Sequence, residues 1–167
     1  MMNDQLKAVM IAMIKHDAHS PKRIQHFMKV HEIASLIGQM EGLDDETQFI
    51  LETAAIVHDI GIKIADEKYG AHPGPKQEQE GMVLVKPLLE EVGGYTPAQI
   101  ERITYLVGHH HTYTNVSGID YRILLEADLL VNLYESEVRY KKILKAENKV
   151  FQTPSGIWLL EHMFNYD

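Results

Sequence analysis

The chain has 167 residues, enough for one domain with its own hydrophobic core. Its 16 basic and 24 acidic side chains give a formal charge of −8, which argues against broad electrostatic binding to nucleic acid or to an anionic membrane. There is no cysteine, so disulfides and thiolate metal sites are excluded. No apolar run approaches a membrane span and the first residues lack a signal-peptide pattern, so we expect a cytoplasmic protein.

Two helices are predicted in the first forty residues. Apolar side chains at three- and four-residue spacing indicate an amphipathic helix over residues 2–16, and Ser20, followed by proline, starts a second helix that runs to about Glu41. His26 lies at the edge of the apolar stripe of this helix and can point inward, whereas we expect His31 to face solvent. His26 is then either a hydrogen-bonded core residue or a ligand.

A third helix, capped by Asp44 or Asp45, leads into the adjacent pair His58 and Asp59. Gly61 follows, and because glycine often ends a helix in a left-handed turn, we expect the pair in the last turn of a buried helix. Unpaired carbonyls there favour a cation, and an imidazole beside a carboxylate suits Zn, Mn or Fe. In the alternative interpretation, His58 caps the helix and Asp59 bonds a backbone amide.

The helical pattern breaks over residues 62–80, where glycines and prolines predict a loop. Its polar side chains include Lys63, Asp66, Lys68, Tyr69 and His72. Loops held by rigid helices often carry substrate contacts, and a solvated surface is the alternative. A fourth helix is expected to start near residues 77–80, and Pro87 should kink or divide it.

A fifth helix starts at Thr96 and Pro97 and ends in three consecutive histidines, His109, His110 and His111. Successive residues on a helix diverge by about 100°, so all three can hardly serve one ion. Either one or two of them are ligands, or the run is a solvated turn.

A sixth helix begins at Asp120 or Tyr121 and carries Asp128 in an apolar run. A carboxylate in such a run should be paired or should bind a metal, because burying it bare is costly. We expect that Glu126 and Asp128 cannot both face inward, and the flanking residues favour Asp128. Thr153, followed by proline, opens a last helix that closes the core.

In this order, His26, His58, Asp59 and Asp128 resemble the motif of the HD superfamily of metal-dependent phosphohydrolases. The resemblance implies that these four residues hold a divalent transition metal, which would be Fe, Mn, Zn, Co or Ni. One ion is expected and two are compatible with the pattern.

The resemblance also implies the fold and the extent of the domain. We expect an all-α HD-domain helical bundle of about six to seven helices. Residues 1–167 would form a single HD domain, in which the terminal helices pack on a motif-bearing core of about residues 23–135. Apolar residues on the terminal helices would serve either this core or a homodimer.

Many members of the superfamily hold a second ion, and here the resemblance points to His110 first and His109 second. The segment where relatives carry an earlier histidine contains none, so Glu80 or Glu78 would supply an oxygen ligand, with His72 as a weaker substitute.

The resemblance also suggests groups that contact the substrate. A lysine that often directly follows the glycine in relatives is isoleucine here, and Lys63 stands one place later. Lys63, Lys68 and His72 are candidates to bind phosphate, and His111 is a candidate among the three histidines to protonate a leaving oxygen.

The resulting hypothesis is a metal-dependent phosphohydrolase that acts through an activated water on a small anionic substrate, either a nucleotide or a phosphorylated metabolite. Two alternatives remain open at this point. One is a di-iron oxygenase of the HD type, and the other is a non-catalytic nucleotide-binding sensor.

Overall fold

The computed structural model of the protein describes residues 2–136 and 150–164. These residues form eight α-helices and no β-strand, which confirms the expected all-α bundle with one helix more than the upper expectation. The helices are α1 (Asp4–His16), α2 (Pro21–Met40), α3 (Asp45–Val57), α4 (Ile62–Tyr69), α5 (Gly74–Val92), α6 (Pro97–Val107), α7 (Ile119–Glu135) and α9 (Pro154–Met163). None of the described helices is long and apolar enough to cross a membrane.

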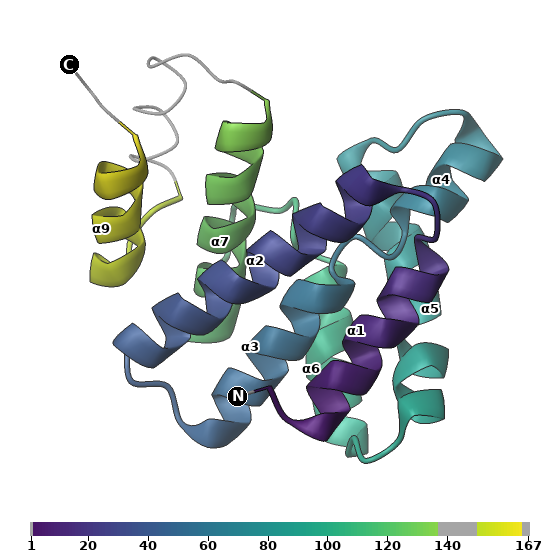
Figure 1. The fold of residues 1–167 in the computed structure, drawn as a ribbon, viewed down its shortest axis with the longest axis horizontal. Coiled ribbons are helices and arrows are strands. Elements are labelled where there is room, and N and C mark those ends of the chain that lie inside the picture. Colours follow the sequence, from purple (N-terminus) through teal and green to yellow (C-terminus); the bar gives the residue numbers. More distant parts are fainter. Residues whose placement is uncertain (1, 137–149, 165–167) are drawn as a thin grey trace.

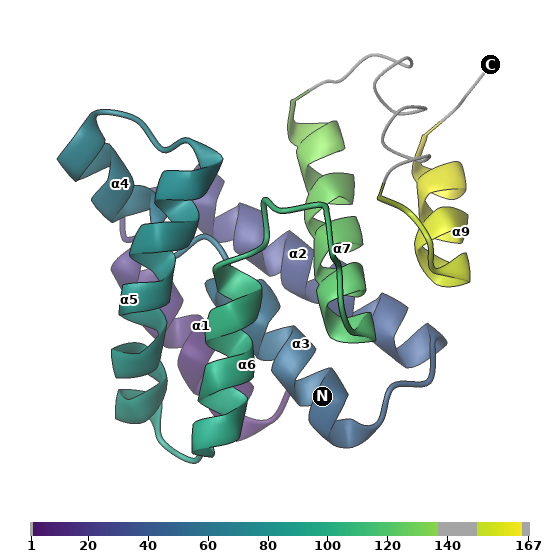
Figure 2. The ribbon, with the colours of Figure 1, turned by 180° about the vertical axis from the view of Figure 1, so that it is seen from behind.

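Helix α3 lies at the centre of the bundle. It contacts α1, α2, α6 and α7, and α2 crosses over both α3 and α7 (Figure 1). Seen from behind, α5 and α6 lie side by side, on the side of the bundle away from α9 (Figure 2). The C-terminal half of α3 is fully buried from Ala54 to Val57, so the chain enters the His58–Asp59 pair from the middle of the core.

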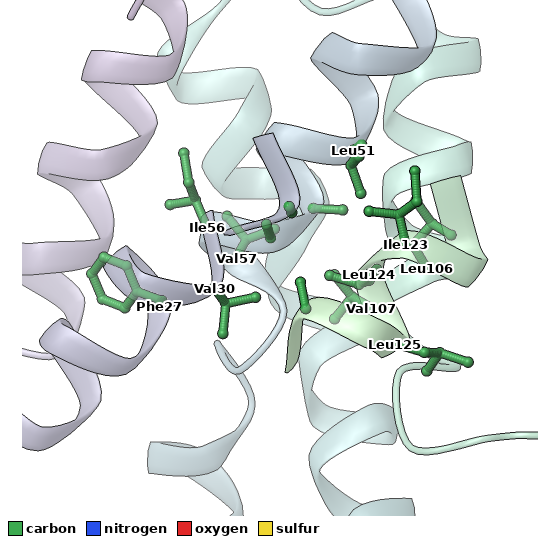
Figure 3. Close-up of a cluster of buried hydrophobic side chains, with 14 of the residues drawn as sticks. Phe27, Val30, Leu51, Ile56, Val57, Leu106, Val107, Ile123, Leu124 and Leu125 are labelled. Carbon is green, nitrogen blue, oxygen red and sulfur yellow. The ribbon is translucent and has the colours of Figure 1, made fainter. Parts of the chain in front are cut away.

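Apolar side chains of α2, α3, α6 and α7 meet in one part of the core (Figure 3). Phe27 and Val30 of α2 carry no exposed surface, and neither do Leu106 of α6 and Ile123 of α7. Burying such side chains is the main stabilising contribution in a domain of this size. These helices also carry the polar residues of the candidate site, which gives that site a rigid frame.

The predicted helix starts are confirmed by their caps. The Asp44 side chain accepts a hydrogen bond from the Thr47 amide at 2.8 Å, and Thr96 forms a full capping box with Gln99. Thr153 accepts from the Gly156 amide at 2.9 Å.

The expected loop over residues 62–80 is wrong in two respects. Residues Ile62–Tyr69 form α4, with Ile62 and Ala65 buried one turn apart, and Gly70 ends the helix with φ of 70°. The next helix begins at Gly74, earlier than expected, because a proline occupies its first turn. Pro87 lies inside α5 and does not divide it.

Two expectations about side-chain direction are also wrong. His31 is buried, and its Nε2 lies 3.0 Å from Glu52 Oε1 on α3. Glu126 and Asp128 are both buried, because α7 is covered on two sides. Side chains two positions apart on a helix point about 200° away from each other, so Glu126 faces the start of α9 instead of the site. There it accepts hydrogen bonds from the amides of Gln152 and Thr153, just before α9, at 2.9 and 3.0 Å.

Gly61 does not have the expected left-handed conformation, since its φ is −78°. A Cβ atom at this position would overlap the carbonyl oxygen of Gln77 and lie 2.6 Å from the backbone nitrogen of Gly81. Glycine is therefore needed here for the close approach of α5 to the turn that follows Asp59.

Candidate metal centre

Four polar side chains from three helices meet at one point in the interior. His26 comes from the second turn of α2, His58 is the C-cap of α3, Asp59 follows it, and Asp128 lies in the middle of α7. His58 is fully buried, and His26 and Asp128 are 7% and 3% exposed. Groups that the sequence separates by about a hundred residues are brought together by the packing of α2 and α7 on α3.

The Nε2 atoms of His26 and His58 lie almost equally far from each other and from one carboxylate oxygen each of Asp59 and Asp128. His26 Nε2 is 3.2 Å from His58 Nε2, 3.2 Å from Asp59 Oδ2 and 3.1 Å from Asp128 Oδ1. His58 Nε2 is 3.3 Å from Asp59 Oδ2 and 3.2 Å from Asp128 Oδ1. Atoms that share one ion at about 2.1 Å are themselves roughly 3.0 to 3.4 Å apart. The spacing fits a common ion.

Hydrogen bonds at the other ring nitrogens support the same conclusion. His26 Nδ1 lies 3.0 Å from Glu135 Oε1, and His58 Nδ1 lies 2.7 Å from the Ala55 carbonyl oxygen. Each Nδ1–H has an acceptor, so Nε2 is the nitrogen of each ring that faces the common point, where an ion would take the place of its proton. A carboxylate or carbonyl behind a histidine is the usual arrangement around a protein metal.

The electrostatics favour a cation at this point. Burial would lower the pKa of His26, but hydrogen bonds to Asp128 and Asp59 outweigh it and raise the pKa to about 10. Burial would raise the pKa of Asp59, but His58, His110 and His26 hold it well below its ordinary value. The carboxylates therefore stay ionised, and positive charge, as protons or as an ion, is attracted between them.

A second cluster shares Asp59 with the first. His110 Nε2 lies 3.2 Å from Asp59 Oδ1, the carboxylate oxygen that faces away from His26 and His58. One ligand-type atom from each of Asp59, His110 and His111 lies within 4.8 Å of the others. The His110 Nδ1–H donates to the Val107 carbonyl oxygen at 2.6 Å, which leaves Nε2 as the nitrogen that faces Asp59. Burial lowers the pKa of His111 to about 4, so this ring is neutral at neutral pH.

The start of α5 braces this second cluster. Gln77 Oε1 lies 2.8 Å from His111 Nε2, which places an amide oxygen in the segment that contains no histidine. Glu78 accepts hydrogen bonds from the His111 amide and from the Thr112 hydroxyl, both at 3.1 Å. Glu78 therefore holds the histidine turn by its backbone.

Five predicted site residues lie outside both clusters, namely His109, Lys63, Lys68, His72 and Glu80. His109 stacks on Tyr105, and its Nδ1 lies 2.7 Å from the Tyr105 carbonyl oxygen. Lys68 donates to Glu80 at 3.0 Å, and Lys63 donates to the His16 carbonyl oxygen at 3.4 Å. The roles first predicted for these residues stay untested predictions.

A cavity of about 430 Å³ opens over the first cluster. Its wall contains His26, Asp59 and Asp128 of the cluster, and His111 and Gln77 of the second cluster. Further residues of the wall are Ser20, Lys22, Arg23, Ile62, His72, Asn132, Glu135 and Ser136. Ile62 is the one apolar residue among the described residues of the wall, and basic side chains come from the first turn of α2.

Glu135, Gln77 and Asp66 contribute to the site and were not predicted from the sequence. Glu135 is two helical turns after Asp128, so the spacing alone places both on one face of α7, and this signal could have found it. Gln77 lies in the segment that contains no histidine, and nothing in the sequence distinguishes its amide from that of a surface residue. Asp66 lies on α4, where no helix was expected.

Taken together, these features define an all-helical bundle whose buried His/Asp centre fits a divalent metal. A family model described as HD domain matches residues 23–149, more than half of the chain, and the chain therefore belongs to the HD domain family. Members of this family are generally metal-dependent hydrolases. No curated protein matches the chain, and no solved structure matches it either.

The role of Glu135 behind His26 can be tested by Glu135→Gln. We expect a loss of metal affinity of about 10- to 100-fold, because the neutral amide no longer raises the basicity of the imidazole. The metal affinity is measured by competition with a metallochromic chelator. Glu90→Gln, an exposed carboxylate on α5 paired only with Lys86, is the matched control. Equal affinities for the two variants would show that Glu135 does not act through His26.

Proposed function

We propose that the protein hydrolyses a phosphate ester or anhydride bond in a small anionic substrate, a phosphorylated metabolite or a nucleotide. The observation that carries this proposal is the convergence of His26, His58, Asp59 and Asp128, three of which line a cavity that also has basic side chains in its wall. The point of convergence suits a divalent metal and the basic side chains suit a phosphate. The bond type and the substrate are part of the proposal.

His26, His58, Asp59 and Asp128 would hold the metal. A divalent ion at this position supplies positive charge that acidifies a water molecule and offsets the charge of phosphoryl oxygens. The chain contributes the orientation of the ligands, because Glu135 and the Ala55 carbonyl fix the rings of His26 and His58. His58 is fully buried behind the cavity wall, so its ring has no contact with bulk water.

The first turn of α2 is the part of the wall best suited to receive a phosphate. Lys22 and Arg23 both line the cavity, four and three residues before the candidate ligand His26. The amides at a helix N-terminus add partial positive charge in the same direction. A phosphate bound there would lie between basic groups and the metal centre.

Metal content and phosphate release test the proposal together. Untagged protein is purified without chelator, its metal content is measured by plasma mass spectrometry, and phosphate release is followed on a panel of phosphomonoesters, nucleotides and pyrophosphate. We expect at least one transition metal per chain and phosphate release that chelation removes and added metal restores. Protein that binds no metal after reconstitution, or that contains metal and releases no phosphate from any member of the panel, would contradict the proposal.

A second candidate function is supported by the two faces of Asp59. Its Oδ2 faces the first cluster and its Oδ1 faces His110, an arrangement that suits two ions bridged by one carboxylate. A pair of iron ions there would suit an oxygenase of the HD type. Substrate-dependent dioxygen uptake by protein that holds two irons per chain would favour this function, and full activity with manganese alone under anaerobic conditions would remove it.

A further inference from the structure

A three-residue network on the cavity wall stands apart from both His/Asp clusters. Asp66, on the unexpected helix α4, lies with its Oδ2 2.7 Å from Arg23 Nη2 and with its Oδ1 2.7 Å from His72 Nδ1. Arg23 and His72 both line the cavity that contains the metal centre. Three segments, the start of α2, α4 and the α4–α5 connection, are therefore joined by one carboxylate.

This network orients the imidazole of His72. The Nδ1–H of the ring donates to Asp66, which leaves Nε2 as the nitrogen available to the cavity. The His72 carbonyl oxygen accepts a hydrogen bond from Gln77 Nε2 at 2.5 Å, so the loop is also fixed to α5. The His72 side chain is 49% exposed and can be reached by a bound substrate.

Arg23 helps to fix the orientation of the Asp66 carboxylate. Its guanidinium and the imidazole of His72 occupy different oxygens of the carboxylate, so neither displaces the other. A histidine with a carboxylate behind one nitrogen is the usual form of an oriented acid–base group. His72 and Asp66 have this form on an element that carries none of the four ligands of the first cluster.

We propose that His72 is the general acid that protonates the leaving oxygen of the substrate, and that Asp66 and Arg23 are positioning residues that act through it. This inference rests on the proposed hydrolase function. In the step, a water oxygen bonds to phosphorus while the phosphorus–oxygen ester bond breaks. The proton on His72 Nε2 passes to the departing oxygen, so that an alcohol and phosphate are formed. The attacking water releases one proton to solvent, and His72 takes one proton back from solvent, so the step balances.

The location of His72 is consistent with this role. Attacking and leaving oxygens stand roughly in line in phosphoryl transfer, so the groups that serve them lie on different sides of the phosphorus. The first cluster comes from α2, the end of α3 and α7, whereas His72 enters the wall from the α4–α5 connection. The histidines of the second cluster are held by Asp59 and Gln77, which leaves His72 as the exposed imidazole of the cavity wall among the described residues.

Leaving-group dependence gives the test. Wild type and His72→Gln, both loaded with metal, are compared on glycerol 2-phosphate, whose alkoxide needs a proton to leave, and on p-nitrophenyl phosphate, whose phenolate does not. We expect kcat on the alkyl ester to fall by about 10²-fold or more, and kcat on the aryl ester to stay within about threefold of wild type. His162→Gln, an exposed histidine on α9, is the matched control and should match wild type on both esters.

Asp66→Asn separates orientation from a structural role. The asparagine keeps a hydrogen-bond acceptor for His72 but loses the charge, so we expect a smaller loss of kcat that is again confined to the alkyl ester, with KM little changed. Equal losses on both esters, or no loss in His72→Gln, would overturn the inference while leaving the hydrolase function intact. A wild-type protein that hydrolyses neither ester nor any other phosphate would overturn the proposed function, and this inference with it.

Discussion

Asp59→Asn is expected to lose its metal and to reduce turnover by at least about 10³-fold, the equivalent of about 4 kcal/mol of transition-state stabilisation. The reason is that Asp59 serves both clusters at once. Its Oδ2 lies 3.2 Å from His26 Nε2, and its Oδ1 lies 3.2 Å from His110 Nε2. An asparagine offers one oxygen and no charge, so at least one cluster loses its ligand.

The variant should nevertheless stay folded. Asp59 follows His58, the C-cap of α3, and among the described residues its side chain accepts no hydrogen bond from a helix-end amide. Its neighbours in the site, His58 and His26, are held by separate bonds to Ala55 and Glu135. Metal content by plasma mass spectrometry, turnover and far-ultraviolet circular dichroism are measured on the same preparation. Asp45→Asn, an exposed carboxylate in the first turn of α3, is the control and should retain both metal and activity. Normal turnover in Asp59→Asn would refute the assignment of the centre.

The parts of the fold that were predicted from the sequence have strong local signals. Helix starts at Asp44, Thr96 and Thr153 combine a capping side chain with the onset of apolar periodicity, and the caps are present in the structure. The histidines and aspartates of the first cluster were identified because their order resembles the HD motif. Their common point in space required the packing of α2 and α7 on α3, which no local pattern specifies.

The parts that were missed depend on tertiary packing. Helix α4 is short, its buried residues are only Ile62 and Ala65, and its polar face resembles a loop in sequence. Glu126 and Asp128 were expected to compete for one inner face, but α9 covers the other side of α7 and buries Glu126 there. A sequence pattern records one apolar stripe per helix and cannot show a second neighbour.

The placement of α4 links the fold to the proposed chemistry. Because residues 62–69 form a helix rather than a loop, Asp66 has a fixed position from which it joins Arg23 and His72. The turn between α3 and α4 also contains Gly61, against which the first two turns of α5 pack. The approach of α5 to this turn therefore determines where Gln77 meets His111.

Gly61→Ala tests this close approach and is expected to lower the free energy of unfolding by about 3 kcal/mol, at the upper end of the usual cost of overpacking. The added methyl group would overlap the Gln77 carbonyl oxygen and lie 2.6 Å from the Gly81 nitrogen, and these are backbone atoms that can move only if α5 moves. Urea unfolding measures the change.

Gly42→Ala is the control for Gly61→Ala, because Gly42 has φ of 73° but nothing within 4 Å of a Cβ atom. Its cost should be limited to the left-handed backbone conformation, about 1 kcal/mol. Displacement of α5 would also carry Gln77 away from His111, so the metal-loaded Gly61→Ala protein should lose activity that Gly42→Ala keeps. If Gly61→Ala were no less stable than Gly42→Ala, the contact between the turn and α5 would not have the tightness that the structure shows.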